Sequence, residues 1–143
     1  MPDFSGSFTG QITMQTAIRL TDQPNHDMSL AEVSGTQKSS DARWNGGAIK
    51  YWGVTDLLDG KGTQTGYFTT EHGDKGRDFG TFEGKATTAG GQMVVEGSWK
   101  FTGGTGEFKG LSGGGTFKTK PTSPTDLECS WQGTYELAKG QAG

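Results

Sequence analysis

The sequence predicts an all-β fold, a closed antiparallel barrel of about eight strands joined by short turns. First, 26 of the 143 residues are glycine, more than twice the usual share of about 7%, and glycine destabilises helices. Second, eight Phe, four Trp and three Tyr are too many for a disordered chain. Third, apolar and polar residues alternate with the period of two that is typical of strands. The length predicts a single domain, residues 1–143.

Residues 4–20 show this alternation most clearly. The even positions are apolar or glycine, apart from Thr16, and the odd positions are mostly polar. We therefore expect the even positions to face the core and the odd positions to face water. Gly6 and Gly10 are expected to mark bends or bulges, because a strand of this length rarely stays straight.

Seven further strands are expected, each bounded by residues typical of turns. Residues 21–27 and 41–47 have the composition of turns, and DGKG at 59–62 is a strong hairpin signal. Because the first and last strands are both long and well patterned, we expect them to pair and close the barrel, which removes exposed sheet edges. The seven strands are expected at residues 29–40, 48–58, 63–72, 79–87, 93–101, 115–120 and 127–137.

A glycine-rich segment, GGTGEFKGLSGGGTF at 103–117, interrupts the late strands. It is not a dinucleotide-binding loop, because the third glycine of that motif would fall at Lys109 and no helix follows. We instead expect at most one short helical turn within 104–111. From it, Phe108 and Leu111 would point inward and close one end of the barrel, while glycines supply the left-handed backbone angles.

Composition argues against several classes of function. A net charge of -3 and the lack of a basic cluster argue against a nucleic-acid partner. No apolar stretch is long enough for a membrane helix, and no cofactor motif occurs, so we expect neither membrane nor cofactor. Cys129 is the only cysteine and lies on an apolar strand face, as a buried small residue would. With no basic and apolar leader in the sequence as given, we expect a cytoplasmic location, and a signal peptide already cleaved is the alternative.

Titratable side chains gather near two of the predicted turns. His26 and His72 both lie beside turns and have no partners at metal-ligand spacing, so we expect solvated side chains and no metal site. Glu71, Asp78 and their charged neighbours crowd one hairpin. Two readings stay open for them: ordinary solvated charges, or a general base at the mouth of the barrel.

The aromatic residues outnumber what a small packed core needs. They predict either a solid core or an apolar cavity that binds a small molecule in the barrel interior. The alternative function is a non-catalytic structural or protein-interaction barrel that acts as a homodimer or homotrimer. The candidate ligand-binding residues are Tyr51, Trp52, Phe68, Glu71, Phe82, Trp99, Trp131 and Tyr135.

The segments GGTGEF and KGLSGGGTF resemble the late turn of the allene oxide cyclase and dirigent-like barrels, including small bacterial members of that superfamily without an assigned activity. The resemblance rests on about fifteen residues. It implies an eight-stranded barrel without a cofactor, frequent homo-oligomers and, in the cyclases, an interior that holds a fatty-acid-derived epoxide. Any activity would then be that of a cofactor-free isomerase or cyclase. The catalytic residues of the cyclases do not carry over, because nothing around Glu71 or Glu83 matches their motif.

Overall fold

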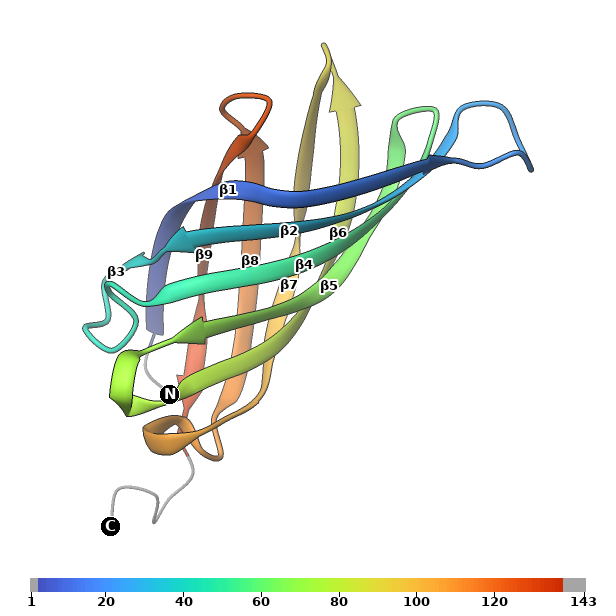
Figure 1. Cartoon of the computed structure of the whole chain (residues 1–143). Helices are drawn as coiled ribbons and strands as arrows, with labels where there is room; N and C mark the ends of the chain where they lie inside the picture. The colour runs from blue at the N-terminus through green and yellow to red at the C-terminus, as the bar shows by residue number, and fades with distance from the viewer. Residues whose placement is uncertain (1–2, 138–143) are drawn as a thin grey trace.

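A computed structural model describes residues 3–137 and shows an all-β barrel (Figure 1). Eight long antiparallel strands form the closed barrel, and a two-residue strand and two 3-10 turns complete it. The predicted fold class is confirmed. The strands are β1 (Asp3–Arg19), β2 (His26–Thr36), β3 (Lys38–Ser39), β4 (Ala48–Leu58), β5 (Lys61–Glu71), β6 (Arg77–Ala89), β7 (Gln92–Gly104), β8 (Ser112–Pro121) and β9 (Asp126–Glu136).

The first and last strands close the barrel, as the sequence predicts. Around the barrel the order is β2-β4-β5-β6-β7-β8-β9-β1, and β1 pairs again with β2. Residues 3–11 of β1 pair with β9, whereas residues 10–19 pair with β2. The two pairings use successive parts of β1, so this strand runs past the end of β9 (Figure 1).

A β-bulge changes the direction of the side chains halfway along β1. Phe4 and Phe8 are buried, as predicted, but the register shifts between Ile12 and Met14. One extra residue reverses which face the following side chains occupy. Met14 and Ile18 therefore lie on the outer face, with exposed fractions of 68% and 60%. The expectation that all even positions to residue 20 face the core is wrong beyond the bulge.

The two glycines expected to mark bends or bulges in β1 lie outside the observed bulge and against large side chains. The bulge follows Ile12, and neither Gly6 nor Gly10 is part of it. A methyl group on Gly6 would overlap the Trp131 ring, and one on Gly10 would overlap Val33. Glycine at these two positions therefore makes room for large side chains across the barrel interior.

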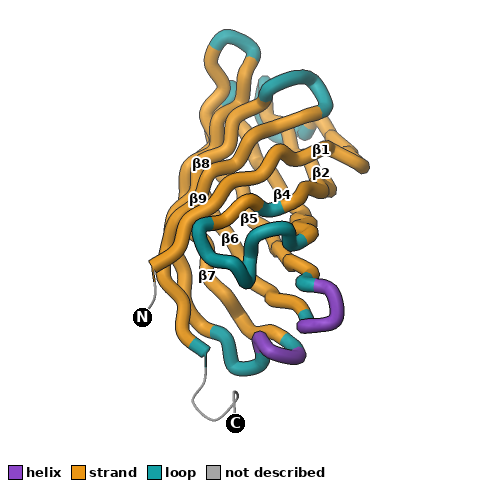
Figure 2. Tube along the Cα trace, turned by 90° about the vertical axis from the view of Figure 1, so that its left-hand side faces the viewer, coloured by secondary structure: helices purple, strands orange, loops and turns teal. Residues whose placement is uncertain are grey.

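Two 3-10 turns, η1 (Gly73–Lys75) and η2 (Gly106–Phe108), lie together at one end of the barrel (Figure 2). The sequence predicts at most one helical turn, so η1 is a correction. The glycines at 73 and 76 have φ of 66° and 116°, angles that other residues rarely adopt. The predicted inward position of Phe108 and Leu111 is confirmed, because both side chains are buried. Within residues 3–137, no helix is both long and apolar enough to cross a membrane.

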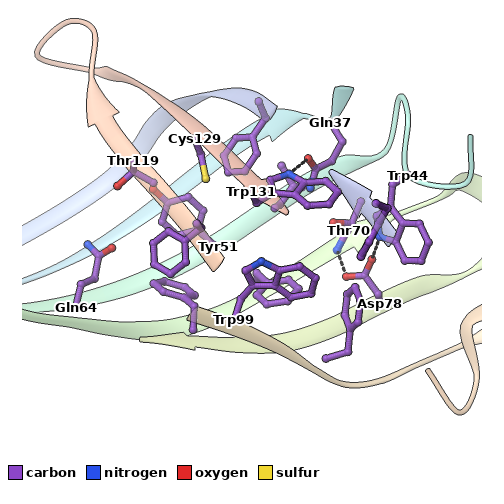
Figure 3. Close-up of a pocket in the computed structure, with 17 residues that line it drawn as sticks. Gln37, Trp44, Tyr51, Gln64, Thr70, Asp78, Trp99, Thr119, Cys129 and Trp131 are labelled. Carbon is purple, nitrogen blue, oxygen red and sulfur yellow. Dashed lines mark hydrogen bonds between the residues drawn. The ribbon is translucent and has the colours of Figure 1, made fainter. Parts of the chain in front are cut away.

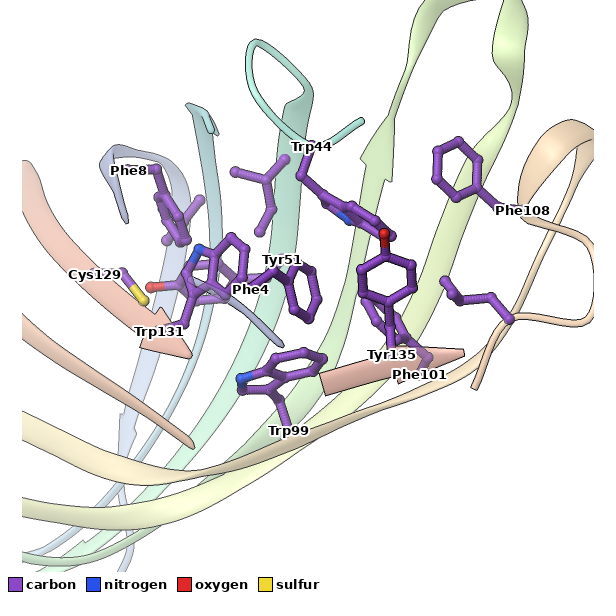
Figure 4. Packing of buried hydrophobic residues seen from close by; sticks show 13 residues of the cluster. Phe4, Phe8, Trp44, Tyr51, Trp99, Phe101, Phe108, Cys129, Trp131 and Tyr135 are labelled. Atoms are coloured by element: carbon purple, nitrogen blue, oxygen red, sulfur yellow. The ribbon is translucent and has the colours of Figure 1, made fainter. Parts of the chain in front are cut away.

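The core is a continuous cluster of mostly aromatic side chains (Figure 4). Phe4 lies at its centre, with ring centroids 4.8 Å from Trp44, 4.8 Å from Tyr135 and 4.9 Å from Trp131. Most of these pairs are tilted or edge-to-face, which is the favourable arrangement of aromatic rings. The cluster joins β1 and β9 to the loop between β3 and β4, and so ties the closing strands to the floor of the barrel.

Candidate functional site

A cavity of about 70 Å³ lies within the barrel, above the floor formed by the two 3-10 turns (Figure 3). Its walls are mostly aromatic, because inward-facing positions on β1 and on β4 through β9 alternate with outward-facing ones. Glycines between these positions leave space for the rings. The aromatic lining residues are Phe4, Phe8, Trp44, Tyr51, Phe68, Phe82, Trp99, Phe101, Phe117 and Trp131.

Few polar groups line this cavity, and some already have partners. The Trp131 indole N–H donates to Gln37 at 2.9 Å, and the Gln64 amide donates to the Thr55 hydroxyl at 2.9 Å. The Tyr51 hydroxyl belongs to the same lining, in the predominantly aromatic part of the barrel. Burial raises the pKa of Tyr51, so its hydroxyl keeps its proton at physiological pH. A protonated phenol can donate a hydrogen bond to an acceptor on a bound molecule.

A buried polar cluster forms the floor of the cavity around Asp78. Its carboxylate is fully buried and receives three donors. The Trp44 indole N–H donates at 2.8 Å, the Thr70 backbone N–H donates at 3.2 Å, and His72 Nε2 lies 3.0 Å away. His72 Nδ1 lies 2.9 Å from the Arg43 carbonyl oxygen. The two ring nitrogens of His72 therefore join Asp78 to the loop that carries Arg43.

The burial of this pair corrects the expectation of solvated turn residues. The His72 side chain is only 2% exposed, and its ring stacks on Phe108 with centroids 4.1 Å apart. No local pattern in the sequence marks this burial, because it depends on Trp44 reaching under the barrel from a distant loop. A buried polar cluster of this kind is stable only when its polar atoms are bonded, as they are here.

Neither Asp78 nor Cys129 is available for acid–base or nucleophilic chemistry in this arrangement. Both oxygens of Asp78 already accept hydrogen bonds from protein donors, so the carboxylate positions Trp44 and His72. Cys129 is buried, as the sequence predicts, and burial raises the pKa of its thiol to about 12. A thiol in this state is not a nucleophile at neutral pH.

A second histidine cluster ties the β1–β2 turn to β4. His26 Nδ1 lies 2.7 Å from Asp22, and His26 Nε2 lies 2.6 Å from Asp56. The expectation that His26 is a solvated turn residue is therefore wrong, since its side chain is only 14% exposed. The hydrogen bonds to Asp22 and then to Asp56 raise the pKa of His26, and His26 lowers the pKa of Asp22.

We expect the contribution of His26 to stability to decrease at alkaline pH. A raised pKa in the folded state gives stability that is fully present below the unfolded value of about 6.5 and is lost as pH rises through the folded value. Urea unfolding of the wild type and His26→Gln measures this contribution as a difference between the two free energies. The difference should be largest from about pH 5 to 6.5 and should shrink above that range. A difference that grows with pH would contradict the assignment.

The structure separates the eight predicted ligand-binding residues into three groups. Tyr51, Phe68, Phe82, Trp99 and Trp131 line the cavity. Tyr135 is buried beside the cavity wall, and its hydroxyl donates to Asp41 at 2.6 Å.

Trp52 and Glu71 lie on the outer face, which corrects their predicted interior position. The Trp52 indole N–H donates to Glu32, and Glu71 pairs with Arg77. Each follows an inward-facing residue in its strand and must point the other way. The sequence prediction did not include several residues that line the cavity: Phe4, Phe8, Trp44, Gln37, Gln64 and Asp78. The alternation in residues 4–20 could have identified Phe4 and Phe8.

Comparisons with known proteins add no functional assignment. No protein-family model matches the sequence, and a search of curated proteins finds no significant match. Within residues 3–137, no three His, Cys, Asp or Glu side chains converge as metal ligands would. The barrel is compatible with the resemblance to allene oxide cyclase-like proteins, but architecture alone does not establish a family.

Proposed function

We propose that the barrel binds a small, mainly apolar cyclic molecule that carries one hydrogen-bond acceptor. The observation that carries this proposal is an aromatic cavity whose lining includes the hydroxyl of Tyr51. Ligand sites are typically apolar with a few polar groups that fix orientation. Here the rings would provide the apolar contacts, and Tyr51 would orient the ligand.

The cavity volume limits the size of the ligand. An engineered cavity of about 150 Å³ accepts benzene, about twice the volume found here. A single ring therefore enters only when neighbouring side chains turn aside, and Phe68 and Phe82, both incompletely buried, are placed to do so. The fatty-acid-derived epoxide implied by the resemblance is far larger than this space.

The proposal is binding without catalysis. A cofactor-free isomerase or cyclase needs an acid, a base or a nucleophile within reach of its substrate. The Asp78 carboxylate is occupied by protein donors, and the Cys129 thiol stays protonated. These observations favour a binding protein over the enzyme that the resemblance implies.

A matched pair of ligands tests the role assigned to Tyr51. Benzaldehyde and toluene are similar in size, but only benzaldehyde has a carbonyl acceptor. We expect both to saturate in NMR titrations that follow the indole N–H signals of Trp99 and Trp131. Tyr51→Phe should weaken benzaldehyde binding by about two- to tenfold, the value of one hydrogen bond, and leave toluene binding unchanged.

The control variant is Tyr67→Phe, which removes a hydroxyl from the outer wall, where the side chain is exposed. It should change neither affinity. Titrations that never saturate with either compound would refute binding in the interior. Equal weakening of both compounds by Tyr51→Phe would refute the hydrogen bond while leaving the cavity as the site.

A further inference from the structure

The second half of β1 has a partner strand on one edge only. The pairing with β9 ends at Gln11, and the last contact is a hydrogen bond from the Ile12 N–H to the Thr125 carbonyl, 2.8 Å long. Beyond this point residues 13–19 pair with β2 alone among the described strands. In Figure 1 the blue strand β1 continues past β9 with its upper edge uncovered. Backbone N–H and C=O groups on this edge are available to another strand.

This edge lacks the features that usually prevent strand addition. All residues in 13–19 are exposed, and residues 11–18 include no charged residue and no proline. Natural edge strands are normally protected by lysine, proline, a covering loop or a bulge that ends the pairing. Here the bulge precedes the segment, and so it leaves seven consecutive residues open. The single charge, on Arg19, is neutralised by Asp27 on the neighbouring strand.

The outer face beside the edge is largely apolar. The bulge places Met14 and Ile18 outward, with Ile18 opposite Met28 and Met14 opposite Glu32 on β2. Leu30 lies between these two positions, and Val54 follows it on β4. All five apolar side chains are exposed, Leu30 by 51%. A contiguous apolar face on the outside of a barrel is typical of an interaction surface. The edge and the face belong to one site, which offers both backbone hydrogen bonds and apolar contact.

We propose that residues 13–19 pair antiparallel with the same residues of a second copy, about a two-fold axis through Thr16. In this register Met14 lies opposite Ile18 of the other copy, and Ile18 opposite Met14, so the apolar side chains meet on one face. Thr16 meets its own equivalent at the axis. Such an interface is self-complementary, as a two-fold dimer requires. Moving the axis by one residue, to Ala17, would place Ile18 opposite Thr16. Both pairs of Met14 with Ile18 would then be lost.

The resulting dimer would carry one sheet across both barrels. On the outer face of this sheet, a row of neighbouring side chains runs from Val54 through Leu30 to Thr16 in each copy. The two rows would meet at Thr16. A second copy is favoured over a different partner because the segment is complementary to itself in this register. No charged residue lies opposite a residue of like charge, since Arg19 would face Thr13. Addition of a strand to an exposed edge is a general mode of recognition. The proposal does not depend on a ligand in the barrel interior.

Cysteine cross-linking of the full chain tests the register. Residues directly opposite in an antiparallel pair have Cα atoms about 4.5–5.5 Å apart, within the range of a disulfide. Thr16→Cys should therefore form a covalent dimer under mild oxidation. Met14→Cys alone should not, because its equivalent lies about 13 Å away along the strand, whereas Met14→Cys/Ile18→Cys should. The native Cys129 does not interfere, because its thiol is buried. Thr116→Cys on the exposed face of β8 is the matched control and should stay monomeric on denaturing gels.

Light scattering and sedimentation of the unmodified chain test the assembly itself. We expect a dimer, and we expect Thr16→Lys to raise its dissociation constant at least about tenfold, because like charges then face each other at the axis. Thr116→Lys should leave it unchanged. A strict monomer at all concentrations overturns the proposal. So does a dimer that Thr16→Lys leaves intact and Thr16→Cys does not cross-link, since that dimer would use another surface.

Discussion

Replacing Asp78 with alanine is expected to lower the free energy of unfolding by about 3–5 kcal/mol, because each buried polar group left without its partner costs about 1–3 kcal/mol. The substitution leaves the buried His72 ring without its carboxylate partner. It also leaves the Trp44 indole N–H and the Thr70 backbone N–H without the acceptor they use in the wild type. Because small proteins are stable by only about 5–15 kcal/mol, this is a large part of the total.

Urea unfolding followed by tryptophan fluorescence measures the effect, and Asp74→Ala in the same turn is the control. Asp74 is exposed, so its removal should cost less than about 0.5 kcal/mol. A second comparison isolates the contact between His72 and Asp78. In a His72→Phe background, where no imidazole remains, Asp78→Ala should cost at least about 1 kcal/mol less than in the wild type. Equal costs in both backgrounds would show that the contact between His72 and Asp78 contributes nothing.

Replacing Phe108 with alanine is expected to destabilise the barrel by about 3–5 kcal/mol, the range for large aromatic side chains in a core. Phe108 is 1% exposed, stacks on His72 and lies 5.3 Å from Trp44 between ring centroids. Its removal opens a cavity beneath the Asp78 cluster and loosens the loop that carries Trp44. The floor of the barrel should therefore lose order before the strands do.

Thermal unfolding and amide hydrogen exchange measure this effect. The control is Phe79→Ala, because that ring is 37% exposed on the outer face of β6; it should cost less than half as much. We also expect faster exchange at η1 and η2 in Phe108→Ala, with little change at the middle of β8 and β9. Uniformly faster exchange across all strands would instead mean that Phe108 stabilises the whole barrel and not its floor in particular.

Much of the fold could be predicted from the sequence because its signals are local. Alternation identifies strands, turn residues separate them, and glycines beside Phe108 and Leu111 predict a short helical turn with inward side chains. Each of these features depends on residues close together in the chain. Five cavity residues could also be predicted, because aromatic side chains are a usual lining of small-molecule sites.

The side-chain directions in the middle of the chain could not be predicted in the same way. Tyr51 and Trp52 are adjacent aromatic residues, so one must face inward and the other outward. Their local sequence does not favour either choice. The register with β2 and β5 resolves it, placing Trp52 beside Glu32 and Tyr67. For the same reason the exposure of Met14 and Ile18 follows from a bulge that only the pairing with β2 reveals.

The sequence by itself therefore determined the architecture: antiparallel strands, tight turns, a barrel closed by its two ends, and a floor built around Phe108. Only the tertiary structure decided the chemistry. The burial of His72 and Asp78 requires Trp44 to arrive from a loop more than thirty residues away, and the open edge of β1 appears only once β9 is seen to end beside Gln11. The physical reason is that burial and edge exposure are properties of contacts between distant segments, whereas strand and turn preferences belong to the segments themselves.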